Sequence, residues 1–184
     1  MKQFPQGMQV PSKQHGLTLL EVLIAVVVLA IGLLGVAGLQ LAALQNGQQS
    51  YLRSQASTLA YEIADRMRAN RGQAILGAYM LNASTSTAPV APAAPAVNCN
   101  STNCTPAQFV QSDLSTWYTN VTNTLPAGAA RIICGTPAAA VACTAGSLQT
   151  VQIIWDEQRT GATNANCAAV DANHLSCYSV SFAP

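Results

Sequence analysis

Charged residues are scarce in this sequence of 184 residues. Only 8% of the residues are Asp, Glu, Lys or Arg, against roughly 25% in an ordinary soluble domain. Eight basic and seven acidic residues give a net charge of +1, so the chain lacks the basic surplus that nucleic-acid binding requires. Aromatic residues make up only 5%, although half of the residues are hydrophobic. This composition excludes an ordinary cytosolic domain and a disordered chain.

Residues that could perform catalysis are also few. After residue 16 the chain has a single histidine, His174, and no lysine. The acids of the C-terminal half show no spacing that would place two carboxylates together on one helix face. No nucleophile elbow, phosphate-binding loop or zinc-protease motif is present. We therefore predict that the protein is not an enzyme and uses no cofactor; a membrane-anchored enzyme is a remote alternative. Asp156 and Glu157 are expected to be solvated charges at the end of a strand.

An uncharged segment runs from Val22 to Leu52. At about 1.5 Å per residue, the part from Val22 to about Leu41 spans ~30 Å, which is the thickness of a bilayer core. Residues 1–16 contain Lys2, Lys13 and His15 and no acid. A basic start followed by an apolar run predicts an export or insertion signal. The run is too long for an ordinary cleaved signal, and hydropathy alone leaves a plain transmembrane anchor open.

One acid, Glu21, lies inside the apolar segment. A carboxylate in a membrane helix costs about 2.5–3.5 kcal/mol, so it should have a partner. No Lys or Arg lies between Lys13 and Arg53, which leaves Glu21 without a cation one helical turn away. Cleavage after Gly16 would create a new α-amine at Leu17, and that amine could face Glu21 of the same chain or of a neighbour.

The residues around this acid resemble the class III signal of type IV pilins and pseudopilins. They read KQHG over residues 13–16 and LTLLEVLIA over residues 17–25. The resemblance implies that a prepilin peptidase cleaves between Gly16 and Leu17 and that Leu17 is N-methylated, although most pilins have Phe at this position. It also implies a subunit held in the bacterial inner membrane with a periplasmic head. In the growing filament, Glu21 would pair with an N-terminus.

A long helix should follow the leader peptide of residues 1–16. Its second half carries an apolar stripe with helical spacing, formed by Leu52, Ala56, Leu59, Ile63 and Met67. We predict one helix from about Leu17 to Arg71, with Gly72 as its stop. Residues 17–44 would form the membrane or filament-core half, and residues 45–184 the periplasmic head.

The remainder of the head has clear local signals. Residues 83–97 are rich in Ala and Pro and predict an extended loop. Thr105 and Gln108 form a capping box that starts a helix over residues 106–125, in which Trp117 should be a core residue. Strand patterns follow at residues 130–134, 149–156 and 175–182. This order indicates an α+β fold with an antiparallel sheet; with the resemblance, it indicates the type IV pilin fold, a long N-terminal helix packed on that sheet.

Six cysteines lie in the head. They fall into three close pairs, so of fifteen possible connectivities we favour local pairing: Cys99 with Cys104, Cys134 with Cys143 and Cys167 with Cys177. The alternative, a zinc site, is disfavoured because only the first pair has a suitable spacing and only one histidine is available. We therefore predict no metal. Disulfides are typical of an oxidising compartment such as the periplasm.

Within the pilins, several blocks resemble PilV-type minor pilins. The most discriminating is DRMRAN, at residues 65–70; the others include residues 24–40, Asp113-Leu-x-x-Trp117 and Leu125-Pro-x-Gly128. The resemblance implies a scarce subunit that joins other minor pilins and pilin subunits in priming the fibre, at or near its tip. It also implies display of a large tip adhesin. A major pilin and a type II secretion pseudopilin are the alternatives.

Overall fold

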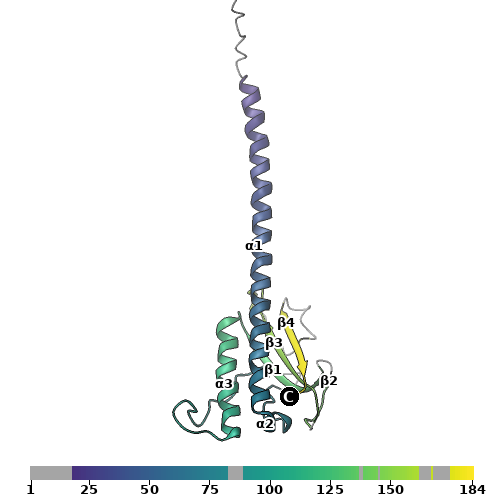
Figure 1. The fold of residues 1–184 in the computed structure, drawn as a ribbon. Coiled ribbons are helices and arrows are strands. Elements are labelled where there is room, and N and C mark those ends of the chain that lie inside the picture. Colours follow the sequence, from purple (N-terminus) through teal and green to yellow (C-terminus); the bar gives the residue numbers. More distant parts are fainter. Residues whose placement is uncertain (1–17, 83–88, 137–138, 145, 162–166, 168–174) are drawn as a thin grey trace, which may run out of the picture. The chain divides into compact units, whose positions relative to one another are not determined.

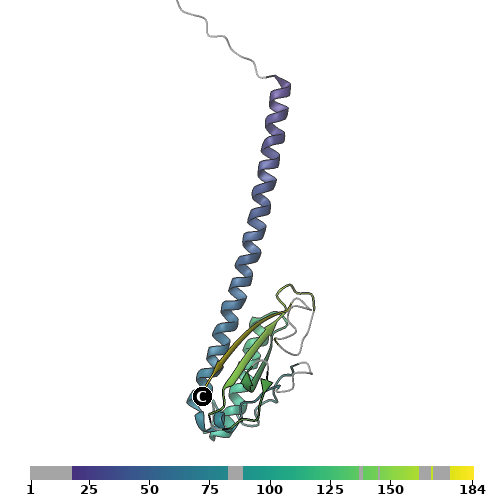
Figure 2. The same ribbon diagram turned by 90° about the vertical axis from the view of Figure 1, so that its right-hand side faces the viewer.

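A computed structural model describes residues 18–82, 89–136, 139–144, 146–161, 167 and 175–184. The chain divides into two compact units, Met1–Asn46 and Gly47–Pro184. The helix α1 (Leu19–Ala69) begins in the first unit and continues into the second. The second unit, which we call the head, contains all the other elements (Figures 1 and 2).

The helix α1 has 51 residues, and no proline interrupts the sequence between Pro11 and Pro89. The prediction of a single long helix is confirmed, but its predicted end was wrong. Instead of continuing to Arg71 and stopping at Gly72, α1 ends at Ala69, and both of those residues belong to the short helix α2 (Arg71–Ile75). The reason is Asn70, which leaves the helical conformation and donates a hydrogen bond from Nδ2 to the carbonyl of Pro106 at 2.8 Å.

The helix α3 (Pro106–Thr124) forms as its capping signal predicts. The hydroxyl of Thr105 accepts from the backbone N–H of Gln108 at 3.3 Å, and the side chain of Gln108 accepts from the N–H of Thr105 at 2.9 Å. The turn after α3 requires glycine at position 128, because there is no room for a side chain there. A Cβ at Gly128 would lie 2.5 Å from the carbonyl oxygen of Val121. The sequence Leu125-Pro-x-Gly128 therefore terminates the helix and lets the chain turn tightly against it.

The sheet is antiparallel throughout, with the order β2-β1-β3-β4. Its strands are β1 (Ala129–Thr136), β2 (Ala139–Ala140), β3 (Gln149–Trp155) and β4 (Ser176–Phe182). The three predicted strands are confirmed, and with them the α+β fold class. The two-residue strand β2 was missed because an Ala-Ala pair carries no strand pattern.

One hydrophobic core lies between the helices and the sheet of the head. All five residues of the predicted α1 stripe are buried in it, and so are Val110, Leu114 and Trp117 of α3. The indole N–H of Trp117 donates to the carbonyl of Leu59 at 2.7 Å, which ties α3 to α1. Figure 1 shows α3 alongside this part of α1. Trp117 is thus the core residue that the sequence predicts.

The strands β1 and β3 are also buried on the face that points away from the core cluster. Ile132 and Val151 are partners across the two strands and belong to that cluster, so their neighbours point to the opposite face. These neighbours, among them Arg131, Thr150 and Gln152, are at most 2% exposed. Burial lowers the pKa of Arg131. An alternating strand pattern predicts one buried and one solvent-exposed face, so it does not predict a sheet that is buried on both faces.

The Ala/Pro segment is described from Pro89 onward and has no regular secondary structure up to residue 95; residues 83–88 of the predicted loop lie outside the described residues. Its burial repeats every third residue, because Pro89, Pro92 and Pro95 are half-buried while the residues between them are mostly exposed. This period fits an extended polyproline-type strand resting on the head. Asn82 fixes its start by bonding both the N–H and the carbonyl of Val90.

The structure contains three disulfides, and each joins neighbouring cysteines in the sequence. They are Cys99–Cys104, Cys134–Cys143 and Cys167–Cys177, with Cα–Cα distances of 5.4, 5.3 and 5.5 Å. Gly77 passes close to the second disulfide with φ at +75°, and a Cβ there would lie 2.8 Å from Cys143 Cβ. The loops of the head are therefore closed by covalent links.

Candidate functional site

The first unit offers an exposed apolar surface. Every described residue from 18 to 46 is exposed, including the aliphatic side chains from Leu19 to Leu44. Among the described residues, α1 is the one helix that is long and apolar enough to cross a membrane. Such a surface requires either lipid or the apolar helices of other subunits as its environment.

Glu21 lies at the start of this surface, in the first turn of α1. Thr18 precedes the helix, and its hydroxyl accepts a hydrogen bond from the backbone N–H of Glu21 at 3.3 Å. The Thr18 carbonyl accepts from the same N–H at 3.0 Å and from that of Val22 at 3.3 Å. Glu21 forms none of the ion pairs found among the described residues. The predicted cleavage residues, Gly16 and Leu17, lie outside the described residues.

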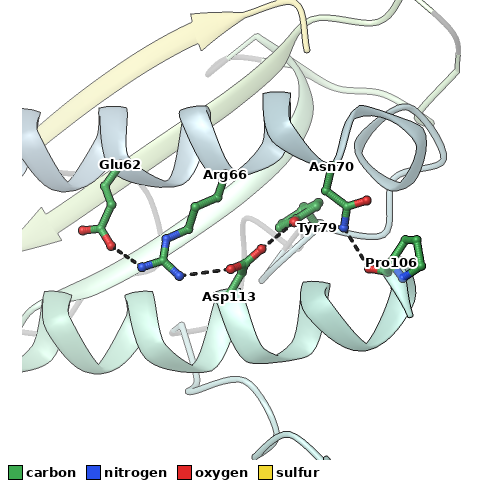
Figure 3. A network of polar contacts seen from close by, with 6 residues as sticks. All are labelled: Glu62, Arg66, Asn70, Tyr79, Pro106 and Asp113. Atoms are coloured by element: carbon green, nitrogen blue, oxygen red, sulfur yellow. Dashed lines mark hydrogen bonds and ion pairs between the residues drawn. The ribbon is translucent and has the colours of Figure 1, made fainter. Parts of the chain in front are cut away.

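The head contains a polar network that joins three segments (Figure 3). The guanidinium of Arg66 pairs with Glu62 at 2.7 Å and with Asp113 of α3 at 3.0 Å. The hydroxyl of Tyr79 donates to the second oxygen of Asp113 at 2.7 Å, and Asn70 donates to the Tyr79 oxygen at 3.3 Å. Asp113 therefore links α1 to α3 and to the segment after α2.

This network changes the acidity of its members. Burial and the hydrogen bond to Asp113 together raise the pKa of Tyr79 well above its ordinary value. Burial lowers the pKa of Arg66, but its bonds to Asp113 and Glu62 outweigh this effect and leave the pKa raised. Both side chains thus keep their protons at any physiological pH. The network is a permanent structural link rather than a proton-transfer site.

Asp156 is not a solvated charge, and this expectation was wrong. The residue is 1% exposed, and its carboxylate accepts from the backbone N–H of Gly161 at 2.7 Å and from the hydroxyl of Thr160 at 3.3 Å. Burial raises the pKa of Asp156, but hydrogen bonds from the backbone N–H groups of Thr160 and Gly161 lower it by more. The net effect is a pKa below the ordinary value of an aspartate. The acid therefore organises the turn after β3. Its neighbour Glu157 is half-buried and accepts a hydrogen bond from the hydroxyl of Ser176.

The described part of the chain contains no group of three or more His, Cys, Asp or Glu side chains that could hold a metal ion. His174 lies outside the described residues. The cysteines are engaged in the disulfides, and the described acids of the head bond to Arg66 or Arg68, to hydroxyl groups or to backbone N–H groups. The arrangement is suited to holding a fold and presenting surfaces.

Sequence reasoning found Glu21 but overlooked two features of this site, the cap that Thr18 provides and the contact between Arg66 and Asp113. Thr18 and Glu21 form the Ser/Thr-x-x-Glu signature of a helix start, which the sequence displays openly. The contact between Arg66 and Asp113 joins residues 47 positions apart, and no local pattern predicts it. Thr18, Arg66 and Asp113 nevertheless lie in blocks that the resemblance singles out. The family signal therefore marked residues whose structural role the sequence did not show.

Two protein families match this chain. The family described as type IV pilin Tt1218 matches residues 38–115, and the prokaryotic N-terminal methylation motif matches residues 11–37. The first match includes the whole polar network, and the second includes Gly16, Leu17 and Glu21. No curated protein and no solved structure matches the chain.

Proposed function

Since this chain is a type IV pilin-like protein, we propose that it acts as a minor pilin, a scarce subunit that helps to prime pilus assembly and to display a tip adhesin. The observation that carries the proposal is the polar network of the head. Arg66 and Asn70 belong to the block at residues 65–70, and Asp113 belongs to Asp113-Leu-x-x-Trp117. These are blocks by which the chain resembles PilV-type minor pilins, and they bond to one another.

Assembly begins in this proposal with processing by the prepilin peptidase. Cleavage after Gly16 removes the basic leader, and Leu17 becomes the N-methylated first residue. The apolar half of α1 then holds the subunit in the bacterial inner membrane, with the head in the periplasm. The disulfides suit that compartment because it is oxidising. The role is structural and requires no catalytic residue.

Glu21 provides the proposed contact with the next subunit. In an apolar filament core, its carboxylate and the amine of a neighbouring N-terminus attract each other strongly. An amine left unpaired there would be costly. The Thr18 cap holds the backbone of Glu21 in the first helical turn, from which its side chain extends. The same pair cannot form before cleavage, because the amine does not yet exist.

Co-purification tests the proposal. The tagged, full-length chain is expressed with the other minor pilins of its own pilus system, extracted from membranes and captured. We expect the processed chain, starting at Leu17, to bring down the other minor pilins and to be nearly absent from the bulk of the fibre. A chain that forms the bulk of sheared fibres is a major pilin. A chain whose deletion abolishes protein secretion but spares pili is a secretion pseudopilin. Either result contradicts the proposal.

A further inference from the structure

The strand β4 forms an open edge of the sheet. It is the last strand in the order β2-β1-β3-β4, and it pairs with β3 along all of its seven residues. Alternate backbone groups of an antiparallel strand point away from its neighbour. Within the described part of the chain, no backbone group outside β3 bonds to β4. Ser179 and Ser181 are exposed, and Tyr178 and Val180 are only half-buried.

The opposite edge of the sheet, formed by β1, is covered. The short strand β2 pairs with the last residues of β1. Further along β1, Leu81 exchanges two backbone hydrogen bonds with Ile132, at 3.0 and 2.9 Å. The side chain of Asn82 donates to the Ala130 carbonyl at 3.0 Å. The head therefore provides partners for the β1 edge, whereas its described residues provide no backbone partner for the β4 edge.

The sequence of β4 also lacks the features that protect exposed edges. Proteins guard an open edge with charged residues, proline, bulges or very short strands, because unpaired backbone groups recruit other strands. The sequence of β4 is SCYSVSF, which contains no charge and no proline. Its register with β3 is continuous and contains no bulge. An unguarded edge of this length is suited to binding a further strand.

A stripe of exposed residues on α1 borders this edge. Arg53, Tyr61 and Arg68 follow one another at intervals of eight and seven residues, so they share one face of the helix. The guanidinium of Arg68 lies 5.0 Å from the centre of the Phe182 ring. Burial and a hydrogen bond to Tyr61 raise the pKa of Tyr178. Figure 2 shows β4 running beside the part of α1 that belongs to the head.

Space remains between this stripe and the start of β4. A cleft of about 380 Å³ is lined by Arg53 on the helix and by Ser176 and Cys177 on the strand. A strand added to β4 would point every second side chain toward α1. One of these side chains would enter the cleft, and those further along would meet Tyr61 and Arg68.

The border of the edge is basic. Arg53 forms none of the ion pairs found among the described residues, and Arg68 pairs with Asp65 at 2.7 Å. Arg71, one turn beyond Arg68, is exposed and donates to a backbone carbonyl. Glu157 also lines the cleft, but it already accepts from a serine hydroxyl. Three arginines thus face two acids that are both engaged, so a complementary segment carries acidic residues.

We propose that the β4 edge binds an extended acidic segment of a partner protein of the same pilus, which joins the sheet as an additional strand. Backbone hydrogen bonds supply the affinity, and the arginines of the stripe select the acidic side chains. A second copy of β4 is disfavoured as the occupant because this strand has no acid to offer to the arginines. The inference rests on the proposed function, which supplies the partner, and it adds the surface and the mode of binding.

Hydrogen exchange of the β4 amides tests strand addition directly. Mass spectrometry with residue-level fragmentation compares the processed full-length chain alone with the same chain captured together with its pilus partners. In the chain alone, the β4 amides that face away from β3 should exchange fast. In the complex they should exchange about tenfold more slowly, since each gains a backbone hydrogen bond. The amides of β1 are the reference and should not change, because both sides of that strand are already paired.

Two results of this experiment would overturn the proposal. One is unchanged exchange of β4 in a complex that does form, which would leave the proposed function intact. The other is slow exchange of every β4 amide in the chain alone, because the edge would then be covered without a partner. Failure to capture any pilus partner contradicts the proposed function as well, so the two failures are distinguishable.

Photocrosslinking identifies the bound segment. A photoreactive phenylalanine derivative replaces the exposed Ser179 of β4 or, as the matched control, the exposed Asn120 of α3. Irradiation of cells should link position 179, and not position 120, to one partner segment rich in Asp and Glu. A link from position 179 to a second copy of this chain, or to a basic segment, would contradict the proposal.

Charge reversal tests the selection of acidic side chains. Arg53→Glu should lower partner capture about fivefold at low salt, and added salt should reduce the difference between variant and wild type. Arg159→Glu makes the same change of charge at an exposed arginine that does not line the cleft, and it should leave capture unchanged. Wild-type capture by Arg53→Glu would show that the stripe does not select an acidic segment.

Discussion

Glu21 is a single carboxylate at the beginning of an exposed apolar helix, and its proposed partner is an amine created by processing. We predict that Glu21→Gln spares cleavage and membrane insertion, because removing a charge makes insertion easier. It should reduce co-purification with the other minor pilins, because a neutral amide cannot neutralise a neighbouring amine. Intact mass and membrane fractionation report the first two properties, and capture of the partners reports the third. A cleaved variant that assembles at the wild-type level would exclude the pairing role.

The raised pKa of Tyr79 predicts how the free energy of unfolding of the head depends on pH in the alkaline range. Its pKa is raised in the folded head, whereas in the unfolded chain it returns to its ordinary value of 10.0. The folded state therefore binds more protons above pH 10, and the free energy of unfolding should fall as the pH rises from there. Tyr79→Phe should flatten this fall.

The measurement is urea unfolding of the processed chain in detergent between pH 8 and pH 11. The exposed Tyr51→Phe is the control and should leave the slope unchanged. Equal slopes for Tyr79→Phe and the wild type would contradict the assignment of the raised pKa to this hydroxyl. Tyr118 also has a pKa raised by burial, so part of the slope should remain in the variant.

At the scale of elements, the ion pair between Arg66 and Asp113 should couple α1 to α3. Their side chains are 31% and 18% exposed, so solvent screens the pair and the expected coupling is about 1 kcal/mol. A double-mutant cycle with Arg66→Gln and Asp113→Asn in urea unfolding measures it. The exposed pair of Arg68 and Asp65 lies within α1 and should give less than about 0.5 kcal/mol. Equal coupling in the two cycles would mean that the network does not join the elements.

The turn after α3 gives a second prediction at this scale. A Cβ at Gly128 would lie 2.5 Å from the Val121 carbonyl oxygen, so Gly128→Ala should destabilise the head by about 1–3 kcal/mol. Gly72→Ala is the matched control, since Gly72 lies in α2 and a Cβ there meets no atom within 4 Å. That change should be neutral or stabilising. Unfolding midpoints compare the two, and a stable Gly128→Ala protein would show that the turn can relax.

The sequence predicted those elements whose signals are local. The capping box at Thr105, the apolar stripe of α1 and the strand patterns each depend on residues within a few positions of one another. The end of α1 was missed because Asn70 is held by Pro106, which is 36 residues away. Asp156 was misjudged because the backbone N–H groups that surround it become available only when the turn to Gly161 has formed. Long-range polar contacts of this kind leave no periodic pattern in a sequence.

The residues of the candidate site also fall into those that the sequence predicts and those that only the folded head brings together. Glu21 was found because a lone acid in an apolar run is unexpected on physical grounds. Arg66 and Asp113 were marked only as parts of a family resemblance, and the folded head was needed to bring them together. The open edge of β4 beside α1 could not be predicted, because the two elements are far apart in the sequence and meet only in the folded head.

At the scale of the whole molecule, the chain combines an apolar helical segment with a head whose loops are closed by disulfides and whose elements are linked by a polar network. An exposed apolar surface of this length needs either a membrane or a filament around it. Minor and major pilins share that requirement, so the apolar helix does not distinguish the two roles. What distinguishes them is the number of copies that enter the fibre. Copy number is therefore the property that bears most directly on the proposed function.

The deciding measurement is the stoichiometry of this chain in sheared, purified pili, determined by quantitative mass spectrometry with isotope-labelled peptides of the head. The account predicts a chain that begins at Leu17 and is present in only a few copies per fibre, together with the other minor pilins. It also predicts that deleting the chain lowers pilus yield and spares protein secretion. A chain that retains residues 1–16 in the fibre, or that supplies most of its mass, would contradict the account.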